Sequence, residues 1–315
     1  QLASDSRRIK AGDVFFAYKG EGGDGRDFIK QAIDQGAAAV VFEATDFAWD
    51  NALAVPHLAV EHLKRHAGDI AHAFYGMPDT QMFTVGVTGT NGKTSCAVWL
   101  GQALSRLGSP TAVIGTLGVG LFSGRAAPEY DVTGYTTPDA VLLAGKLADV
   151  RQAGAASLAI EVSSIGLEQG RTSGMHFDVA VFTNLTRDHL DYHGDMASYE
   201  AAKIKLFEWP NLKTAVLNLD DPAGLRLVSH LRGKFGDALP LTGYTLQNSA
   251  AQPDIEGVSI LRASQALSSQ TDLDGLRALM VDQLRSLTGA TGVHLVLFDA
   301  DSRVERFLAP AAVRF

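Results

Sequence analysis

A stretch near residue 90 combines a strand pattern, a glycine-rich turn and a Lys-Thr pair. The apolar run Phe83–Val87 is soon followed by the residues GTNGKTS and by a helix pattern over Cys96–Leu107. Glycines let backbone N–H groups turn onto an anion, and a helix N-terminus adds its positive end. Lys93 supplies a point charge and Thr94 a hydroxyl for Mg²⁺, so the stretch predicts a phosphate-binding loop. The spacing departs from the usual pattern, which has a glycine at Val87, and a plain strand-to-helix turn is the alternative.

Three further polar clusters follow apolar strand patterns. Glu161 ends the run Ala156–Ile160, where a carboxylate could hold Mg²⁺ beside phosphates or merely cap a helix. The loop NLTRDHLDYHG, residues 184–194, carries two histidines and two aspartates. Zinc is one interpretation, but no cysteine or HExxH accompanies the loop, so one histidine on Mg²⁺ fits phosphate chemistry better. Asn218 follows the strand pattern Thr214–Leu217.

Residues 81–245 alternate strand and helix patterns. Strands are expected at Phe83–Val87, Thr111–Ile114, Ser157–Val162, Asp178–Phe182 and Thr214–Leu217, and helices at Cys96–Leu107, Ala140–Gln152, near Tyr199–Glu208 and from Asp221. This alternation predicts an α/β fold with a mostly parallel sheet covered by helices on both faces. Ligands bind beyond the carboxyl ends of such strands, where all four polar clusters fall.

Residues 1–78 form a smaller predicted α/β domain. Its expected strands are Asp13–Ala17 and Ala37–Phe42, and its expected helices are Phe28–Gln35 and Val60–Tyr75. The loop KGEGGDGRD, residues 19–27, is either a solvated turn or, together with Asp5-Ser6-Arg7, part of a binding site for a polar ligand. A linker at 76–79 leads into the second domain, 79–245, and a polar linker follows at 246–257.

The bulk composition narrows the function classes. The 315 residues are 46% apolar and carry a net charge of −8 without a basic block, which argues against a nucleic-acid partner. A single cysteine, Cys96, excludes an intrachain disulfide and suits a reducing cytoplasm, with core packing favoured over a reactive thiol. No signal peptide or 18-residue apolar run points to export or a membrane, and Gln1 at the start suggests that the true start is missing.

Six runs occur together in a fixed order. They are GTNGKTS at 89–95, TTPD at 136–139, EVSSIGLEQGR at 161–171, TNLTRDHLDYHG at 183–194, YEAAK at 199–203 and NLDD at 218–221. As a set they resemble the Mur ligases. The N-terminal run SDSRRIKAGDVFFAYKGEGGDGRDFI is similar to the uridine-binding domain of one branch of that family. The resemblance covers roughly residues 1–245 and separates this chain from the related folylpolyglutamate synthases.

The resemblance implies roles for individual residues. ATP would be bound by Gly89, Thr90, Asn91, Gly92, Lys93, Thr94 and Ser95, with Asn218 near the nucleotide. Two Mg²⁺ ions would be held by Thr94, Glu161, His189 and Lys203. The last matches a lysine that is carbamylated in the family, although sequence alone would make Lys203 an ordinary solvated helix lysine. The UDP-muramoyl peptide would contact Ser6 on the uridine side, and Thr136, Thr137, Ser163, Gln169 and Arg171. Catalysis would rest on Lys93, Lys203 and His189.

The implied reaction is formation of an amide bond at the expense of ATP. The resemblance is closest to the branch that adds meso-diaminopimelate to UDP-N-acetylmuramoyl-L-alanyl-D-glutamate in peptidoglycan precursor synthesis, as a cytoplasmic monomer. A carboxylate takes the γ-phosphoryl group of ATP to give an acyl phosphate, which the incoming amine then attacks. The sequence leaves open whether diaminopimelate or lysine is added. Ile165 stands where many members have histidine, so the role of that histidine is in doubt.

Beyond residue 245 the resemblance stops. Val258–Ser269 and Asp272–Leu287 are expected helices, Val293–Phe298 a strand and Asp299–Ser302 a turn, a pattern that weakly resembles the opening of a GAF domain over 258–315. An unrelated α/β extension is the alternative. Because the amino-acid-binding domain of the family does not follow, a second hypothesis is a fusion that binds ATP or the UDP-muramoyl peptide without ligating.

Overall fold

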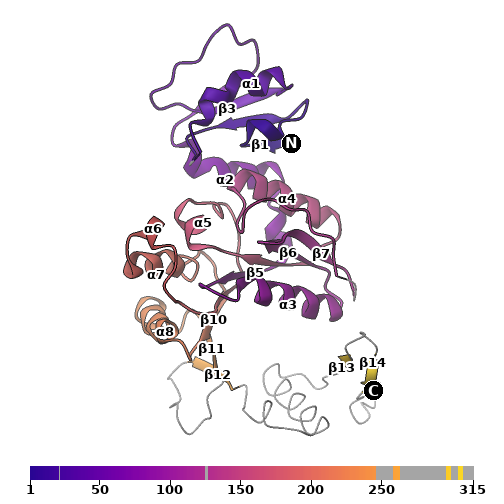
Figure 1. The fold of residues 1–315 in the computed structure, drawn as a ribbon, viewed down its shortest axis with the longest axis vertical. Helices are drawn as coiled ribbons and strands as arrows, with labels where there is room; N and C mark the ends of the chain where they lie inside the picture. The colour runs from indigo at the N-terminus through magenta and orange to yellow at the C-terminus, as the bar shows by residue number, and fades with distance from the viewer. Residues whose placement is uncertain (21, 125–126, 246–257, 263–295, 299–303, 308–315) are drawn as a thin grey trace. The chain divides into compact units, whose positions relative to one another are not determined.

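The computed structural model describes residues 1–245 except 21 and 125–126, together with 258–262, 296–298 and 304–307 (Figure 1). It divides into two compact units, Gln1–Leu241 and Thr242–Phe315. None of the helices in the described residues is long and apolar enough to cross a bilayer.

The first unit opens with a four-stranded parallel sheet in the order β1-β2-β3-β4. Its elements are β1 (Leu2–Ala3), η1 (Ser6–Arg8), β2 (Val14–Ala17), η2 (Gly25–Phe28), α1 (Ile29–Asp34), β3 (Ala39–Glu43), β4 (His57–Val60) and α2 (Leu63–Phe74). Successive side chains of a strand point to opposite faces. Phe15 accordingly packs with Ile29 of α1, whereas Phe16 packs with Leu63 of α2. The expected helix from Val60 begins at Leu63, because β4 occupies residues 57–60.

A larger sheet follows after η3 (Pro78–Gln81). Its strands in the first unit are β5 (Phe83–Thr88), β6 (Thr111–Gly115), β7 (Gly118–Phe122), β8 (Ser157–Glu161), β9 (Val179–Phe182) and β10 (Thr214–Asn218). They lie in the order β10-β9-β5-β8-β6-β7, and only the β6–β7 pair is antiparallel. The predicted mostly parallel sheet is therefore confirmed.

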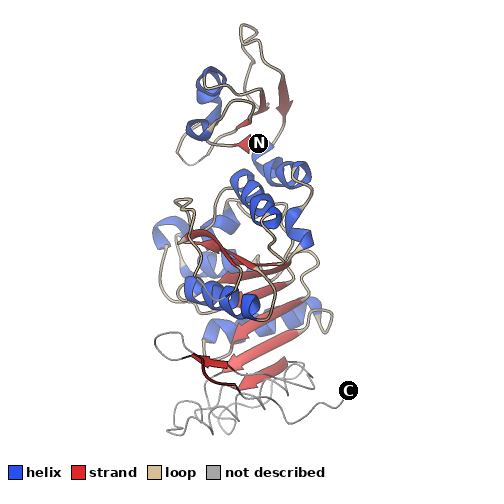
Figure 2. Ribbon diagram, turned by 90° about the vertical axis from the view of Figure 1, so that its right-hand side faces the viewer, coloured by secondary structure: helices blue, strands red, loops and turns tan. Residues whose placement is uncertain are grey.

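Helices cover both faces of this sheet (Figure 2). They are α3 (Lys93–Arg106), α4 (Ala140–Gln152), α5 (Ser164–Glu168), α6 (Leu190–His193), α7 (Met196–Ile204) and α8 (Pro222–Phe235). Ala97 of α3 packs on Val113 and Ala159, which point to one face of β6 and β8. The alternate residues Leu158 and Ile160 point to the other face and are also fully buried, so that face is covered as well.

Helices α2 and α4 join the two sheets of the first unit. They lie side by side (Figure 1), and Leu63, Ala67 and Ala71 of α2 share one buried cluster with Val141 and Ala144 of α4. The first sheet is thus packed directly onto the helix that follows the TTPD run.

Two expectations differ from the structure. Between the expected strand Thr111–Ile114 and the expected helix Ala140–Gln152, where no strand was expected, the chain forms a further strand, β7, because the run GVGLF pairs with β6 as a tight antiparallel hairpin. The helix expected at Val258–Ser269 is wrong at its start: residues 258–262 form β12, next to β11 (Leu241–Thr245). Periodicity alone does not separate a short apolar run such as VSILR from a helix segment.

The remaining expectations for the tail are tested only in part. β13 (Val296–Phe298) coincides with the end of the expected strand at 293–298 and pairs with β14 (Val304–Phe307) in antiparallel fashion. The linker 246–257, the helix Asp272–Leu287 and the turn Asp299–Ser302 lie outside the described residues.

Candidate active site

Three neighbouring strands bring the predicted clusters to one edge of the larger sheet. β5 lies between β8 and β9, with Val87 opposite Glu161 and Thr88 opposite Phe182. The glycine-rich loop after β5 therefore begins beside Glu161 at the end of β8, and beside the loop that follows β9. The strand order explains why residues 70 to 100 positions apart in sequence meet here.

The loop between β5 and α3 takes a shape that requires glycine at two positions. Gly89 has φ 147° and Gly92, at the start of α3, has φ 82°. A Cβ on Gly89 would also collide with the Thr183 hydroxyl. That hydroxyl donates to the carbonyl of Asn91 over 2.7 Å, and the Asn184 side chain accepts from the Asn91 amide over 2.9 Å. The loop after β9 thus holds the glycine-rich loop in place.

Two lysines meet at one carbonyl of this loop. Lys93 Nζ donates to Gly89 O over 2.8 Å and to Thr90 O over 2.9 Å. Lys203, on α7, donates to the same Gly89 oxygen over 2.9 Å. Burial lowers the pKa of Lys93, although Glu161 opposes the shift. Burial, reinforced by the charge of Lys93, lowers the pKa of Lys203 to about 7.

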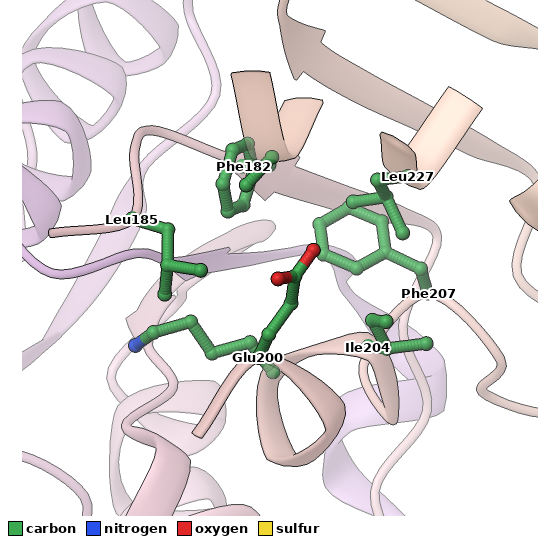
Figure 3. A pocket seen from close by; sticks show the side chains of 8 residues that line it. Phe182, Leu185, Glu200, Ile204, Phe207 and Leu227 are labelled. Carbon is green, nitrogen blue, oxygen red and sulfur yellow. The ribbon is translucent and has the colours of Figure 1, made fainter. Parts of the chain in front are cut away.

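An apolar pocket lies beside the Lys203 side chain. It is lined by Phe182, Leu185, Glu200, Lys203, Ile204, Phe207, Ala223 and Leu227. Figure 3 shows the Glu200 carboxylate reaching in among the rings of Phe182 and Phe207. That carboxylate pairs with Arg226 over 2.8 Å, so it does not compensate the lysine. Because Lys203 is buried, its ammonium loses much of the hydration that favours the charged form.

Glu161 is the buried acid of the site. Its side chain is 1% exposed and accepts from the Thr94 hydroxyl over 3.0 Å and from the Thr116 amide over 2.9 Å. The Thr116 hydroxyl also lies 3.0 Å from the hydroxyl of Thr136. Within the described residues no basic side chain forms an ion pair with Glu161. A buried carboxylate without a cation is costly, so a divalent ion beside Thr94 fits these residues.

The predicted metal ligands do not form one cluster by themselves. Across the described part of the chain, no three His, Cys, Asp or Glu side chains converge on a point that could hold a metal ion. His189 lies after β9 with a left-handed backbone (φ 51°), and its Nε2 is 3.6 Å from the Asp188 carboxylate. An oxygen-rich Mg²⁺ site can draw its remaining ligands from phosphate and water.

The residues expected to contact the peptide end of the substrate form a second hydrogen-bonded group. Thr137 Oγ1 donates to the backbone oxygen of Glu161 over 3.0 Å and lies 3.1 Å from the Ser163 hydroxyl. Arg171 donates to Thr137 O over 2.9 Å and to the Gln169 side chain over 2.7 Å. These side chains surround the end of β8 and stand next to the phosphate-binding loop.

The other predicted residues occupy different places. Asn218 ends β10 and donates to Thr183 O over 2.7 Å, which ties it to the loop after β9. Ser95 is exposed in the first turn of α3. Ser6 is buried at the start of η1, the short helix between β1 and β2 of the first sheet, and not on an element of the larger sheet that carries Glu161.

Sequence reasoning missed Tyr199 as a site residue. Its fully buried ring lies under the Lys203 ammonium, with 4.3 Å from Nζ to the ring centroid, and its hydroxyl is 3.2 Å from Thr90 Oγ1. The ring also contacts His189 edge to face at 6.0 Å. The available signal was its place in YEAAK, four residues before Lys203, which puts both on one face of α7.

Comparisons with known proteins agree with this geometry. The Mur ligase middle domain matches residues 87–267, and the Mur ligase family catalytic domain matches residues 1–75. A UDP-N-acetylmuramoyl-L-alanyl-D-glutamate–2,6-diaminopimelate ligase from Janthinobacterium sp. is 58% identical over 297 residues, which are 94% of this chain and 56% of the relative. The ligase of the same name from Ralstonia nicotianae is 47% identical, over 87% of this chain and 53% of the relative.

Solved structures give the same result. One of a diaminopimelate ligase of that name superimposes with a TM-score of 0.65 at 31% identity, over 79% of this chain and 49% of the other. A MurF structure from Acinetobacter baumannii, at 20% identity and a TM-score of 0.56, shares the fold. The chain spans about half the length of the curated relatives it matches. Because the Mur ligase middle domain matches more than half of the residues of this chain, the chain belongs to the Mur ligase family.

Proposed function

We propose that this chain serves an ATP-dependent ligase that adds meso-diaminopimelate to UDP-N-acetylmuramoyl-L-alanyl-D-glutamate in peptidoglycan precursor synthesis. The observation that carries the proposal is the phosphate-binding loop whose Thr94 contacts a buried, unpaired Glu161, in a chain 58% identical to a ligase of that name. The binding-only fusion gains no support from these relatives, because both are named as ligases.

The reaction divides into two steps. The γ-carboxylate of the D-glutamate residue attacks the γ-phosphorus of ATP, and ADP leaves with the electrons of the broken P–O bond. The amine of the diamino acid then attacks the carbonyl carbon of the acyl phosphate, loses a proton and expels inorganic phosphate. Lys93, at the N-terminus of α3, would neutralise charge that develops on the transferring phosphoryl group, and the rest of the loop would position it.

Thr94 and Glu161 are the residues that would hold one Mg²⁺, and His189 with Lys203 would serve a second. When bound, these ions neutralise phosphate charge and align the two reacting oxygens. The first ion is supported by Glu161, which is buried without an ion-pair partner. The role of His189 is supported by its position on the loop after β9, which also holds Asn91.

Lys203 would act as a carbamate. Its amine lone pair would form an N–C bond to CO₂ and the nitrogen would lose a proton, which leaves an anion able to bind a metal. The reaction needs a neutral amine, and a pKa of about 7 supplies one at physiological pH. The carbamate nitrogen keeps one hydrogen, so the bond to Gly89 O can persist.

The substrate's two ends would be bound by different sheets. Ser6 would lie at the uridine end, on the first sheet. Thr136, Thr137, Ser163, Gln169 and Arg171 would bind the muramoyl-peptide end beside β8. Their hydrogen-bonded network and the positive charge of Arg171 suit a peptide that ends in carboxylates.

Nucleotide binding and amine dependence test the proposal together. Titration with a non-hydrolysable ATP analogue and Mg²⁺ is expected to give binding that Lys93→Ala weakens at least tenfold. Lys30→Ala, which removes an exposed lysine paired with Asp34, is the matched control and should bind as the parent does. Phosphate release in the presence of UDP-muramoyl dipeptide should require the diamino acid. Release that is independent of the amine would contradict a ligase.

A further inference from the structure

The N-terminal segment is hydrogen-bonded to the loop that precedes α4. Ser4 Oγ donates to Asp139 Oδ1 over 2.7 Å, although the two residues are 135 positions apart. Four residues later, Arg8 donates to the carbonyl of Thr133 over 3.2 Å. These two contacts bracket Ser6 on one side and the residues Thr136 and Thr137 on the other.

The Ser4–Asp139 contact is supported from both sides. Asp139 is the N-cap of α4, and its Oδ1 also accepts from the amides of Val141 and Leu142. The hydroxyl of Tyr18, a partly buried residue that packs against the α2–α4 cluster, interacts with the Ser4 side chain. Burial, with the charge of Asp139, raises the pKa of Tyr18, so this tyrosine stays neutral. The Ser4 hydroxyl therefore connects the core of the first sheet to the start of α4.

Apolar packing brings the two parts close, but it does not fix the loop. The α2–α4 cluster contains Leu63 and Val141, which are both fully buried. Val141 lies in the first turn of α4, two residues after the Asp139 cap. Helix α2 also approaches the turn after Arg171 so closely that a Cβ on Gly68 would collide with the backbone of Ser173. Apolar contact is not directional. A charge-assisted hydrogen bond adds the directional element, and Ser4 provides it.

We propose that Ser4 is a positioning residue that sets the relation between the Ser6 segment and the Thr136–Thr137 loop, so that one ligand is bound by both. The inference rests on the proposed function, because it takes the UDP-muramoyl dipeptide as a ligand with two ends. A two-ended ligand gains affinity from the effective concentration of its second end. Loosening the relation between the subsites reduces that gain and leaves each subsite intact.

Ser4→Ala removes the hydroxyl and leaves the Asp139 cap of α4 in place. For the UDP-N-acetylmuramoyl dipeptide we expect Kd to rise about tenfold, which is ~1.4 kcal/mol. For UDP alone, which engages the uridine side only, and for the ATP analogue with Mg²⁺, we expect Kd to change less than twofold. Ser4→Thr keeps the hydroxyl and should restore the parent affinity. Ser229→Ala, on the outer face of α8, is the matched serine control.

The outcomes separate this inference from the proposed function. If the parent chain binds neither UDP nor the UDP-muramoyl dipeptide, the proposed function fails. If the parent binds both ligands and Ser4→Ala binds each of them with the same Kd as the parent, the positioning role is wrong. An equal loss for UDP and for the dipeptide would also overturn it, because it would indicate local damage to the uridine side. Should Ser4→Ala fail to fold, Arg8→Ala, which removes the partly buried second contact, must show the same split between the two ligands.

Discussion

Lys203 should titrate near neutral pH. An ordinary lysine with a pKa near 10.5 is only about 0.3% neutral at pH 8, whereas a pKa of about 7 makes Lys203 about 90% neutral there. The reactive fraction for CO₂ is therefore roughly 300 times larger. Burial is the main cause, and the charge of Lys93 is the second.

The titration can be read from the ¹³Cε signal of labelled lysine in CO₂-free buffer. The Lys203→Met variant assigns the signal by difference, and Lys205→Met, two positions along at an exposed site paired with Glu168, is the control. Lys93→Met should move the midpoint upward, because it removes a like charge but leaves the burial. Adding ¹³C-bicarbonate should then produce a carbamate signal that is absent in Lys203→Met. A midpoint above about pH 9 in the parent would refute the reasoning.

The same shift makes a prediction about stability. The folded-state pKa of Lys203 lies below its unfolded value, so between pH 7 and 10.5 the unfolded chain binds one more proton than the folded one. This residue therefore makes the free energy of unfolding rise with pH across that window, by at most about 1.4 kcal/mol per unit. Urea unfolding at pH 7.5 and 9 should show the rise in the parent and in Lys205→Met, and a smaller one in Lys203→Met.

Three further substitutions test the surroundings of the site. Tyr199→Phe, which removes only the hydroxyl contact with Thr90, should weaken nucleotide binding a few-fold. Tyr199→Leu, which also removes the ring, should in addition shift the midpoint of the Lys203 titration. The same Lys203 midpoint in both variants would exclude a role for the ring. Glu161→Gln removes a buried charge, so the melting temperature without Mg²⁺ should stay the same or rise. The dependence of nucleotide affinity on Mg²⁺ should fall in this variant. An unchanged Mg²⁺ dependence would argue against a metal at this carboxylate. Gly68→Ala should lower the melting temperature by several degrees, because its Cβ meets a backbone atom of Ser173 rather than a flexible side chain, and a stability equal to the parent would show that α2 can shift.

The arrangement of the phosphate-binding loop and its sheet was predictable because the signals are local. Apolar runs ending in polar residues marked the strand ends, and the parallel topology placed those ends at one edge. The loop's contact with Glu161 followed from that order. What did not follow was β7, whose glycine-rich run has no strand pattern until it pairs with β6.

Long-range contacts account for the rest. Nothing around Lys203 in the sequence indicates burial, and its environment comes from Gly89, 114 positions away, and from a pocket closed by α8. Ser4 is likewise an ordinary serine until Asp139 is placed beside it. The metal and substrate roles of His189 and Arg171 stay predictions, because they depend on groups that bind rather than on the chain's own contacts.

The charges in the site are kept from neutralising each other. Lys93 and Glu161 are close enough for the carboxylate to oppose the lowering of the lysine's pKa by burial, yet no ion pair joins these two described residues. The carbonyls of Gly89 and Thr90 hold the ammonium, and the hydroxyl of Thr94 holds the carboxylate. A direct ion pair would satisfy both charges and block both ligands. Because each charge is held by a neutral partner instead, the ammonium stays available to an anion and the carboxylate to a cation. The two buried, unpaired charges lower the stability of the fold, and bound ligands of opposite charge would offset that loss.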